Sequence, residues 1–71
     1  MTIAQDIIDD NVTSNGWVID ENELMADAAD LCISCKVWID EYGYNNGNYY
    51  FADGSVLNVN PCGPEAYIPK F

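Results

Sequence analysis

Between residues 20 and 43 the chain reads DENELMADAADLCISCKVWIDEYG, and this stretch decides the fold. Asp20 with Glu23 three positions later forms a capping box, which predicts a helix start. Apolar residues then return at helical spacing and define a core stripe, namely Leu24, Ala28, Leu31, Cys35, Trp38 and Tyr42. Gly43 suits a left-handed C-cap after the last of them. We therefore predict one long acidic helix through this stretch.

Part of the same stretch favours a β-strand instead of a helix. Residues 33–39, ISCKVWI, are rich in β-branched side chains and partly alternate in polarity, which is typical of a strand. If the helix stops near Cys32, Asn46-Gly47 becomes a hairpin turn and the chain ends in a three-stranded meander. We prefer the long helix, because six stripe positions and a glycine stop agree with it, and keep the meander as the alternative.

The flanking segments carry shorter signals. A capping box that opens at Thr2 predicts a short first helix ending near Asp10. Asp53-Gly54 lies between two apolar runs and predicts a β-hairpin. The prolines from Pro61 onward predict a tail without regular structure. We expect one α+β domain over residues 1–71: a short N-terminal helix, a longer acidic helix, and a C-terminal antiparallel β-hairpin or three-stranded meander.

Charge is the strongest feature of the composition. The 71 residues include twelve Asp and Glu against two Lys, with no Arg and no His, for a formal net charge of −10. Such a surface repels nucleic acid and anionic membranes and attracts basic patches of other proteins. Solubility in a small domain needs a net charge of only about 2 to 8. The excess predicts a macromolecular partner that uses the charge.

Catalytic and metal-dependent classes fit the sequence poorly. The chain lacks the histidine and arginine that most often act as base and transition-state clamp, and it has no glycine-rich phosphate loop. Cys32, Cys35 and Cys62 fall short of a four-ligand zinc set, and we interpret Cys32 and Cys35 as small core or near-core residues. We expect no enzyme activity, no metal and no cofactor. No stretch approaches the roughly 20 apolar residues of a membrane span, and the N-terminus has no signal-peptide pattern, so we expect a cytoplasmic protein.

The acids fall into rows on the predicted helices. Glu23, Asp27 and Asp30 are separated by steps of about 6 and 4.5 Å along a helix axis, comparable to the spacing of phosphates along a nucleic-acid strand. The first helix supplies a second row if the two helices pack side by side. A duplex-like face of this kind would enter a groove lined by Lys and Arg. The predicted partner-binding residues are Asp6, Asp9, Asp10, Glu23, Asp27, Asp30, Asp40 and Glu41.

In length, charge and these acidic arcs, the whole chain resembles the small acidic inhibitors encoded by phages and mobile elements, among them DNA-mimic and anti-CRISPR proteins. The resemblance is one of type and implies stoichiometric inhibition of a CRISPR effector or another DNA-binding protein in the host cytoplasm. It implies a basic, nucleic-acid-binding protein surface as partner, and neither direct nucleic-acid binding nor a membrane. The protein would act as a monomer or a homodimer.

A second hypothesis belongs to another class. The chain is then an interaction module that binds through an aromatic patch, while the acids only solubilise it. Tyr and Trp dominate the binding energy of many interfaces. The candidate aromatics are Trp17, Tyr44, Tyr49, Tyr50 and Tyr67.

Overall fold

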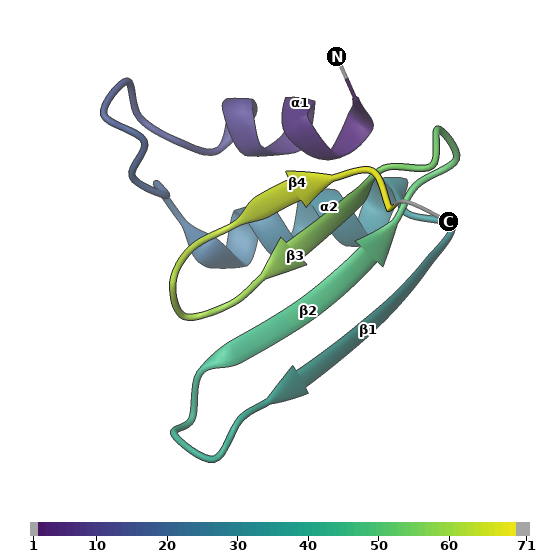
Figure 1. Ribbon diagram of the computed structural model, residues 1–71. Helices are drawn as coiled ribbons and strands as arrows, with labels where there is room; N and C mark the ends of the chain where they lie inside the picture. Colours follow the sequence, from purple (N-terminus) through teal and green to yellow (C-terminus); the bar gives the residue numbers. More distant parts are fainter. Residues whose placement is uncertain (1, 70–71) are drawn as a thin grey trace.

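The computed structural model describes residues 2–69 and has an α+β fold, two helices followed by a four-stranded antiparallel sheet (Figure 1). The elements are α1 (Ile3–Asp10), α2 (Glu21–Leu31), β1 (Ser34–Ile39), β2 (Asn45–Tyr50), β3 (Val56–Val59) and β4 (Glu65–Tyr67). The strands lie in the order β1-β2-β3-β4. Each strand therefore pairs with the next one along the chain.

Both helices lie on the same side of the sheet (Figure 1). α1 lies along β4 and β3 and also packs against α2. Apolar side chains from both helices and from the inner face of the sheet form one core cluster, which consists of Ala4, Ile7, Leu24, Ala28, Tyr49, Phe51, Leu57 and Val59. The helices therefore cover the sheet mainly at its β3–β4 side, and β1 is left at the opposite edge.

The predicted helix starts are confirmed. The Thr2 hydroxyl accepts a hydrogen bond from the Gln5 N–H (3.1 Å) at the start of α1. The Asp20 carboxylate accepts one from the Asn22 N–H (2.9 Å) at the start of α2. Both caps satisfy backbone donors that have no partner inside the helix. These signals are local in the sequence, which is why the sequence alone is sufficient to locate them.

The prediction of one long helix is wrong. α2 ends at Leu31, and Cys32 already has extended backbone angles (φ −74°, ψ 154°). The Ile33 N–H donates to the Tyr50 carbonyl (2.8 Å), and β1 then pairs with β2 along its whole length. The β-branched and aromatic residues of segment 33–39 prefer this paired conformation, and a neighbouring strand is available to satisfy the backbone.

The helical core stripe is wrong for the same reason. Only Leu24 and Ala28 of the stripe are buried, and Leu31 at the end of α2 is 58 % exposed. The last three stripe positions lie beyond the helix, so the helical period does not apply to them. They are Cys35 and Trp38 on β1 and Tyr42 in the turn that follows.

The turn between β1 and β2 lies earlier than the alternative hypothesis placed it. The Asp40 carboxylate accepts hydrogen bonds from the Tyr42 and Tyr44 N–H groups (2.9 and 3.0 Å), and the Gly43 N–H donates to the Asp40 carbonyl (3.0 Å). Gly43 has φ +85°, so its role is that of a hairpin glycine and not of a helix cap. Asn46-Gly47 lies inside β2.

The predicted hairpin at Asp53-Gly54 is confirmed. The Phe51 N–H donates to the Ser55 carbonyl (3.0 Å), and Gly54 has φ +87°. Asp53 also accepts a hydrogen bond from the Ile3 N–H (2.8 Å), which ties the first turn of α1 to this hairpin.

The prediction of an irregular tail is wrong over its middle part. Glu65–Tyr67 forms β4 and pairs with β3, with Leu57 opposite Ala66. Pro64 and Pro69 stand outside this short strand, so neither removes a ladder hydrogen bond from it. The meander consequently has four strands instead of the two or three expected.

Candidate interaction surfaces

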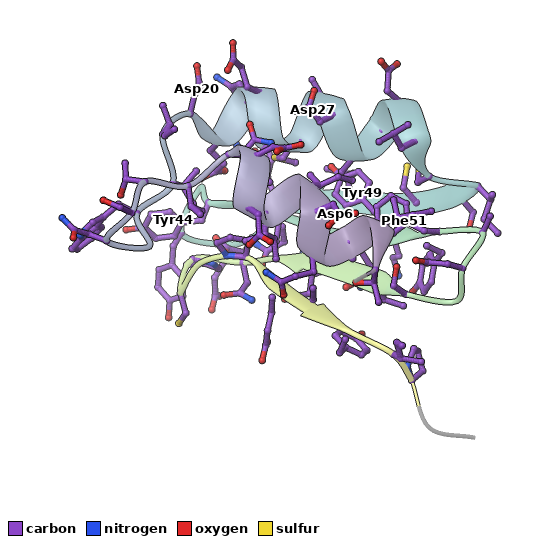
Figure 2. The ribbon with its side chains drawn as sticks, turned by 90° about the horizontal axis from the view of Figure 1, so that it is seen from above. Asp6, Asp20, Asp27, Tyr44, Tyr49 and Phe51 are labelled. Atoms are coloured by element: carbon purple, nitrogen blue, oxygen red, sulfur yellow. The ribbon has the colours of Figure 1, made fainter. Side chains whose placement is uncertain are left out.

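Six of the eight predicted partner-binding acids lie together on the two helices. α1 and α2 run side by side, as Figure 2 shows in the view from above, with Asp6 labelled on α1 and Asp27 on α2. All six are exposed to solvent. We call this set the acidic helical face, and it consists of Asp6, Asp9, Asp10, Glu23, Asp27 and Asp30.

The two rows of acids meet at a hollow between the helices. Asp10 from α1 and Asp27 and Asp30 from α2 line it, with Ile7 and Leu31 as its apolar part, and its volume is about 300 Å³. Three carboxylates from two elements therefore face one concave region. Such a region favours the approach of a cationic side chain.

Asn11 holds the two rows in place, and sequence reasoning missed it. Its side-chain amide donates to the Ile7 carbonyl (2.9 Å) at the end of α1 and to the Asp27 carboxylate (3.0 Å) on α2. Asn11 is 5 % exposed, so these hydrogen bonds are made at the edge of the core. Asparagine directly after a predicted helix reads as a C-cap or loop residue, and only the packing of α1 on α2 shows the second contact.

The remaining two predicted acids do not join this face. Asp40 and Glu41 lie in the turn between β1 and β2, which is at the opposite end of the molecule from α1 (Figure 1). The Asp40 carboxylate also accepts a hydrogen bond from the Asn46 side chain (3.0 Å). Desolvation is the largest single influence on the pKa of Asp40 and acts to raise it, but the hydrogen bonds from Tyr44, Asn46 and the turn backbone together outweigh it and lower the pKa. Asp40 therefore organises the hairpin.

Cys32 packs against the core as predicted, whereas Cys35 is exposed, which corrects the prediction for that residue. Cys35 and Cys62 are exposed and only Cys32 is partly buried, and all three are free thiols. Burial and the neighbouring Cys35 raise the pKa of Cys32, which disfavours its reactive thiolate. Among residues 2–69, no three His, Cys, Asp or Glu side chains are grouped as metal ligands would be.

A second exposed surface is apolar and runs along β1 into the following turn. All six residues of β1 are exposed, and large apolar side chains are prominent among them. We call this set the apolar edge, and its members are Ile33 (71 % exposed), Val37 (49 %), Trp38 (40 %), Ile39 (68 %), Tyr42 (77 %) and Tyr44 (57 %). Val37 and Ile39 lie on the helix side of the sheet and Trp38 on the outer face, so large apolar side chains are exposed on both faces of this edge strand, as is typical of an interaction site.

The five aromatics of the second hypothesis do not form one patch. Tyr49 is 1 % exposed and belongs to the core, and Trp17 lies in the loop between the helices. Tyr50 and Tyr67 flank Val56 on the outer face of the sheet, since each is its register partner. Only Tyr44 belongs to the apolar edge. Most of the other members fall within the long helix predicted from the sequence, so their exposure along one strand was not predicted.

A second hollow, larger than the one between the helices, lies elsewhere. It is open, has a volume of about 500 Å³, and is formed by the loops at residues 15–18 and 60–64. Trp17, which is 74 % exposed, forms part of its wall. Its only ionisable members are Glu21 and Cys62, so it holds no pair of groups suited to acid–base catalysis.

Comparisons of the chain with protein-family models, with curated proteins and with solved structures gave no match. No helix within residues 2–69 is long and apolar enough to cross a membrane. The function is therefore argued from the two surfaces described above.

Proposed function

We propose that this protein is a stoichiometric inhibitor that binds the basic, nucleic-acid-binding surface of another protein through its acidic helical face. One observation carries the proposal: two helices that lie side by side bring six exposed carboxylates to one surface. Lys36 is the only basic side chain within residues 2–69, and it lies on β1. The acidic face therefore has no internal counter-charge from the described side chains.

The spacing of the carboxylates suits imitation of a phosphate backbone. Glu23, Asp27 and Asp30 all fall within α2, so their steps of about 6 and 4.5 Å along the axis apply. Asp6, Asp9 and Asp10 form the second row on α1. A groove that neutralises phosphates with Lys and Arg would bind both rows and exclude its own nucleic acid.

The proposal assigns the protein to the type of phage- or mobile-element-encoded inhibitor that anti-CRISPR and DNA-mimic proteins represent. The partner is a CRISPR effector or another DNA-binding protein in the host cytoplasm. Inhibition needs neither catalysis nor a cofactor, because occupation of the groove is sufficient.

The test is a capture experiment with charge-matched variants. The variant E23Q/D27N/D30N removes three carboxylates from the acidic helical face, and D27N keeps an acceptor oxygen for Asn11. The control E21Q/E41Q/E65Q removes the same charge from exposed acids outside this face. Each protein is immobilised and exposed to a bacterial lysate at low and moderate salt.

We expect the wild type and the control to capture nucleic-acid-binding proteins that added double-stranded DNA releases, and to lose them as salt rises. The helical-face variant should capture at least tenfold less, since three close charge contacts are lost. Equal capture by the two variants would show that overall charge, and not this face, attracts the partner.

The second hypothesis keeps one specific observation in its favour, the apolar edge. Under that hypothesis the protein is a small interaction module, and its partner contacts Trp38, Ile39 and Tyr42. Apolar contacts respond weakly to ionic strength. Capture that persists at high salt and survives E23Q/D27N/D30N would favour this function.

A further inference from the structure

β1 has an unpaired backbone edge (Figure 1). The Asp40 N–H donates to the Tyr44 carbonyl (3.0 Å), and in an antiparallel ladder such hydrogen-bonded positions alternate with unbonded ones. Every second residue from Ser34 to Asp40 therefore bonds to β2 or to the turn that leads into it. The residues between them direct their N–H and C=O groups away from β2, and these are Cys35, Val37 and Ile39.

Only one side chain of β1, Lys36, is of a kind that protects an edge strand. Natural edge strands are commonly short, charged or interrupted by proline. β4 at the other edge has three residues between Pro64 and Pro69, and α1 lies along it. β1 has six residues, all exposed, and Lys36 is the only charge among them. β4 is thus a short edge strand flanked by prolines and lying beside α1, whereas β1 is a longer edge strand without these features.

We propose that β1 pairs with β1 of a second copy of this chain, antiparallel and about a two-fold axis at Val37. The outward N–H and C=O of Val37 then bond to those of Val37 in the partner copy. Cys35 and Ile39 exchange hydrogen bonds in the same way. A C2 interface of this kind needs a strand whose pattern is complementary to itself.

The side chains favour this register over its neighbours. Centred on Val37, the strand places Lys36 opposite Trp38 of the other copy on the outer face. The Lys36 ammonium already lies 6.0 Å from the Trp38 ring centre within one chain, so the two side chains are compatible partners. A register centred on Lys36 would place two like charges opposite each other, which is destabilising.

The charge of β1 is compatible with a second copy at this edge. Two chains of net charge −10 repel each other wherever their acids approach. Between Asp30 and Asp40 the sequence has no acid and one lysine, so two copies that meet along β1 bring no acid of this strand together. In the proposed register Asp40 faces Ser34, and no acid faces an acid.

The pairing has a structural consequence for the acidic helical face. Cys35 is opposite Tyr49, whose ring is buried, so the odd residues of β1 face the helix side of the sheet. A two-fold axis perpendicular to the sheet keeps that side common to both copies. The dimer therefore has one eight-stranded sheet, with the helices of both copies on the same side.

The first measurement is the mass in solution by sedimentation equilibrium. We expect a shift from 7.9 kDa toward twice that value as the protein concentration rises. The shift should grow with added NaCl, because salt screens the repulsion between the copies. A monomer at every concentration and salt level would overturn the proposal, including the case in which the edge pairs only with another protein.

Charge variants at Val37 test the register. Val37 is half-exposed and outside the core, so V37K and V37D should fold, as circular dichroism will verify. Each variant alone places like charges on the two-fold axis and should be monomeric. An equimolar mixture should recover the dimer mass, because Lys then faces Asp.

The matched controls are Y67K and Y67D on β4, where the side chain is similarly exposed at the opposite edge. Both controls should dimerise as the wild type does. Dimerisation of V37K and V37D alone, or loss of dimers in the Tyr67 controls, would overturn pairing through β1. No result of this experiment depends on the proposed inhibitor function.

Discussion

Three of the twelve acids stabilise a helix start or a turn, because their carboxylates accept hydrogen bonds from nearby backbone N–H groups. Asp20 caps α2, Asp40 closes the turn between β1 and β2, and Asp53 organises the turn between β2 and β3. In each case a carboxylate accepts from backbone N–H groups two residues on, the usual role of Asp in turns and caps. These residues explain part of the acidic composition without any partner.

Asp53 gives the fold a dependence on pH. The Ser55 hydroxyl and the backbone N–H groups of Ile3 and Ser55 donate to its carboxylate and lower the pKa of Asp53. A lowered pKa in the folded state means that the stabilisation is present above the unfolded pKa, about 3.9, and is lost as pH falls through the folded value.

We therefore expect D53N to have a lower melting temperature than the wild type at neutral pH, since an amide offers one acceptor oxygen where the carboxylate offers two. The difference should shrink as the pH falls below about 3.9. Thermal unfolding of both proteins across this range checks the prediction, with E65Q as an exposed acid that should follow the wild type. A difference that stays constant with pH would contradict it.

The elements that the sequence predicted correctly are those with a local signal. Thr2 and Asp20 cap helices within three residues, and Asp53-Gly54 turns the chain within four, so neighbouring residues contain the necessary information. β1 and β4 depend on partners distant in the chain. Apolar spacing through segment 33–39 fits either period, and only the presence of β2 decides in favour of a strand.

Gly47 shows how such a tertiary contact overrides a local signal. Asn-Gly is typical of a hairpin turn, yet Gly47 lies inside β2. Gly47 is paired with Val37 on β1 and Val59 on β3, which holds it in the strand. The missing side chain leaves room for the Tyr49 ring, because a Cβ added at Gly47 would lie 2.9 Å from its Cε2 atom. Tyr49 is 1 % exposed and fixed by the core, so the ring occupies the space that a side chain would need.

We expect G47A to lower the free energy of unfolding by about 1–3 kcal/mol, the usual cost of overpacking a filled site. Urea denaturation followed by circular dichroism measures this change. If G47A were as stable as the wild type, the Tyr49 ring would have to move freely away from β2, contrary to its burial. The same residue therefore tests how β2 joins the core.

At the scale of the whole molecule, the sequence predicted the charge of the proposed binding surface but only part of its arrangement. The acids of α1 and α2 lie on adjacent helices, as the helical spacing indicated. Asp40 and Glu41 were included only because the predicted helix was too long. The apolar edge was missed for the same reason, since a residue's exposure depends on what packs against it and not on its own type.

The two surfaces respond to salt in opposite directions. Binding of a basic partner to the acidic helical face should weaken as ionic strength rises, because the contacts are between opposite charges. Self-association through the apolar edge should strengthen, because each copy has a net charge of −10. A change in ionic strength therefore separates the two interactions without any mutation.

The net charge also acts on the fold itself. The molecule measures 31 × 29 × 22 Å, about equal to the Debye length of roughly 30 Å at 0.01 M salt. At that ionic strength, carboxylates on opposite sides of the protein still repel each other. At 0.15 M the Debye length falls to about 8 Å, and only neighbouring acids interact. The folded state holds its acids closer together than the unfolded chain does, so screening favours folding.

We accordingly expect the melting temperature to rise between 0.01 and 0.15 M NaCl, by about 4–8 °C for each kcal/mol of repulsion relieved. Protein concentration must stay fixed, because dimerisation also shifts the melting temperature. The variants E23Q/D27N/D30N and E21Q/E41Q/E65Q each reduce the net charge by three, so both should show a shallower rise. If E23Q/D27N/D30N reduces the salt-dependent rise in melting temperature more than E21Q/E41Q/E65Q does, most of the repulsion lies between α1 and α2, where three carboxylates line one hollow. A melting temperature that is constant or falls with salt would contradict the expectation that unbalanced charge destabilises this fold.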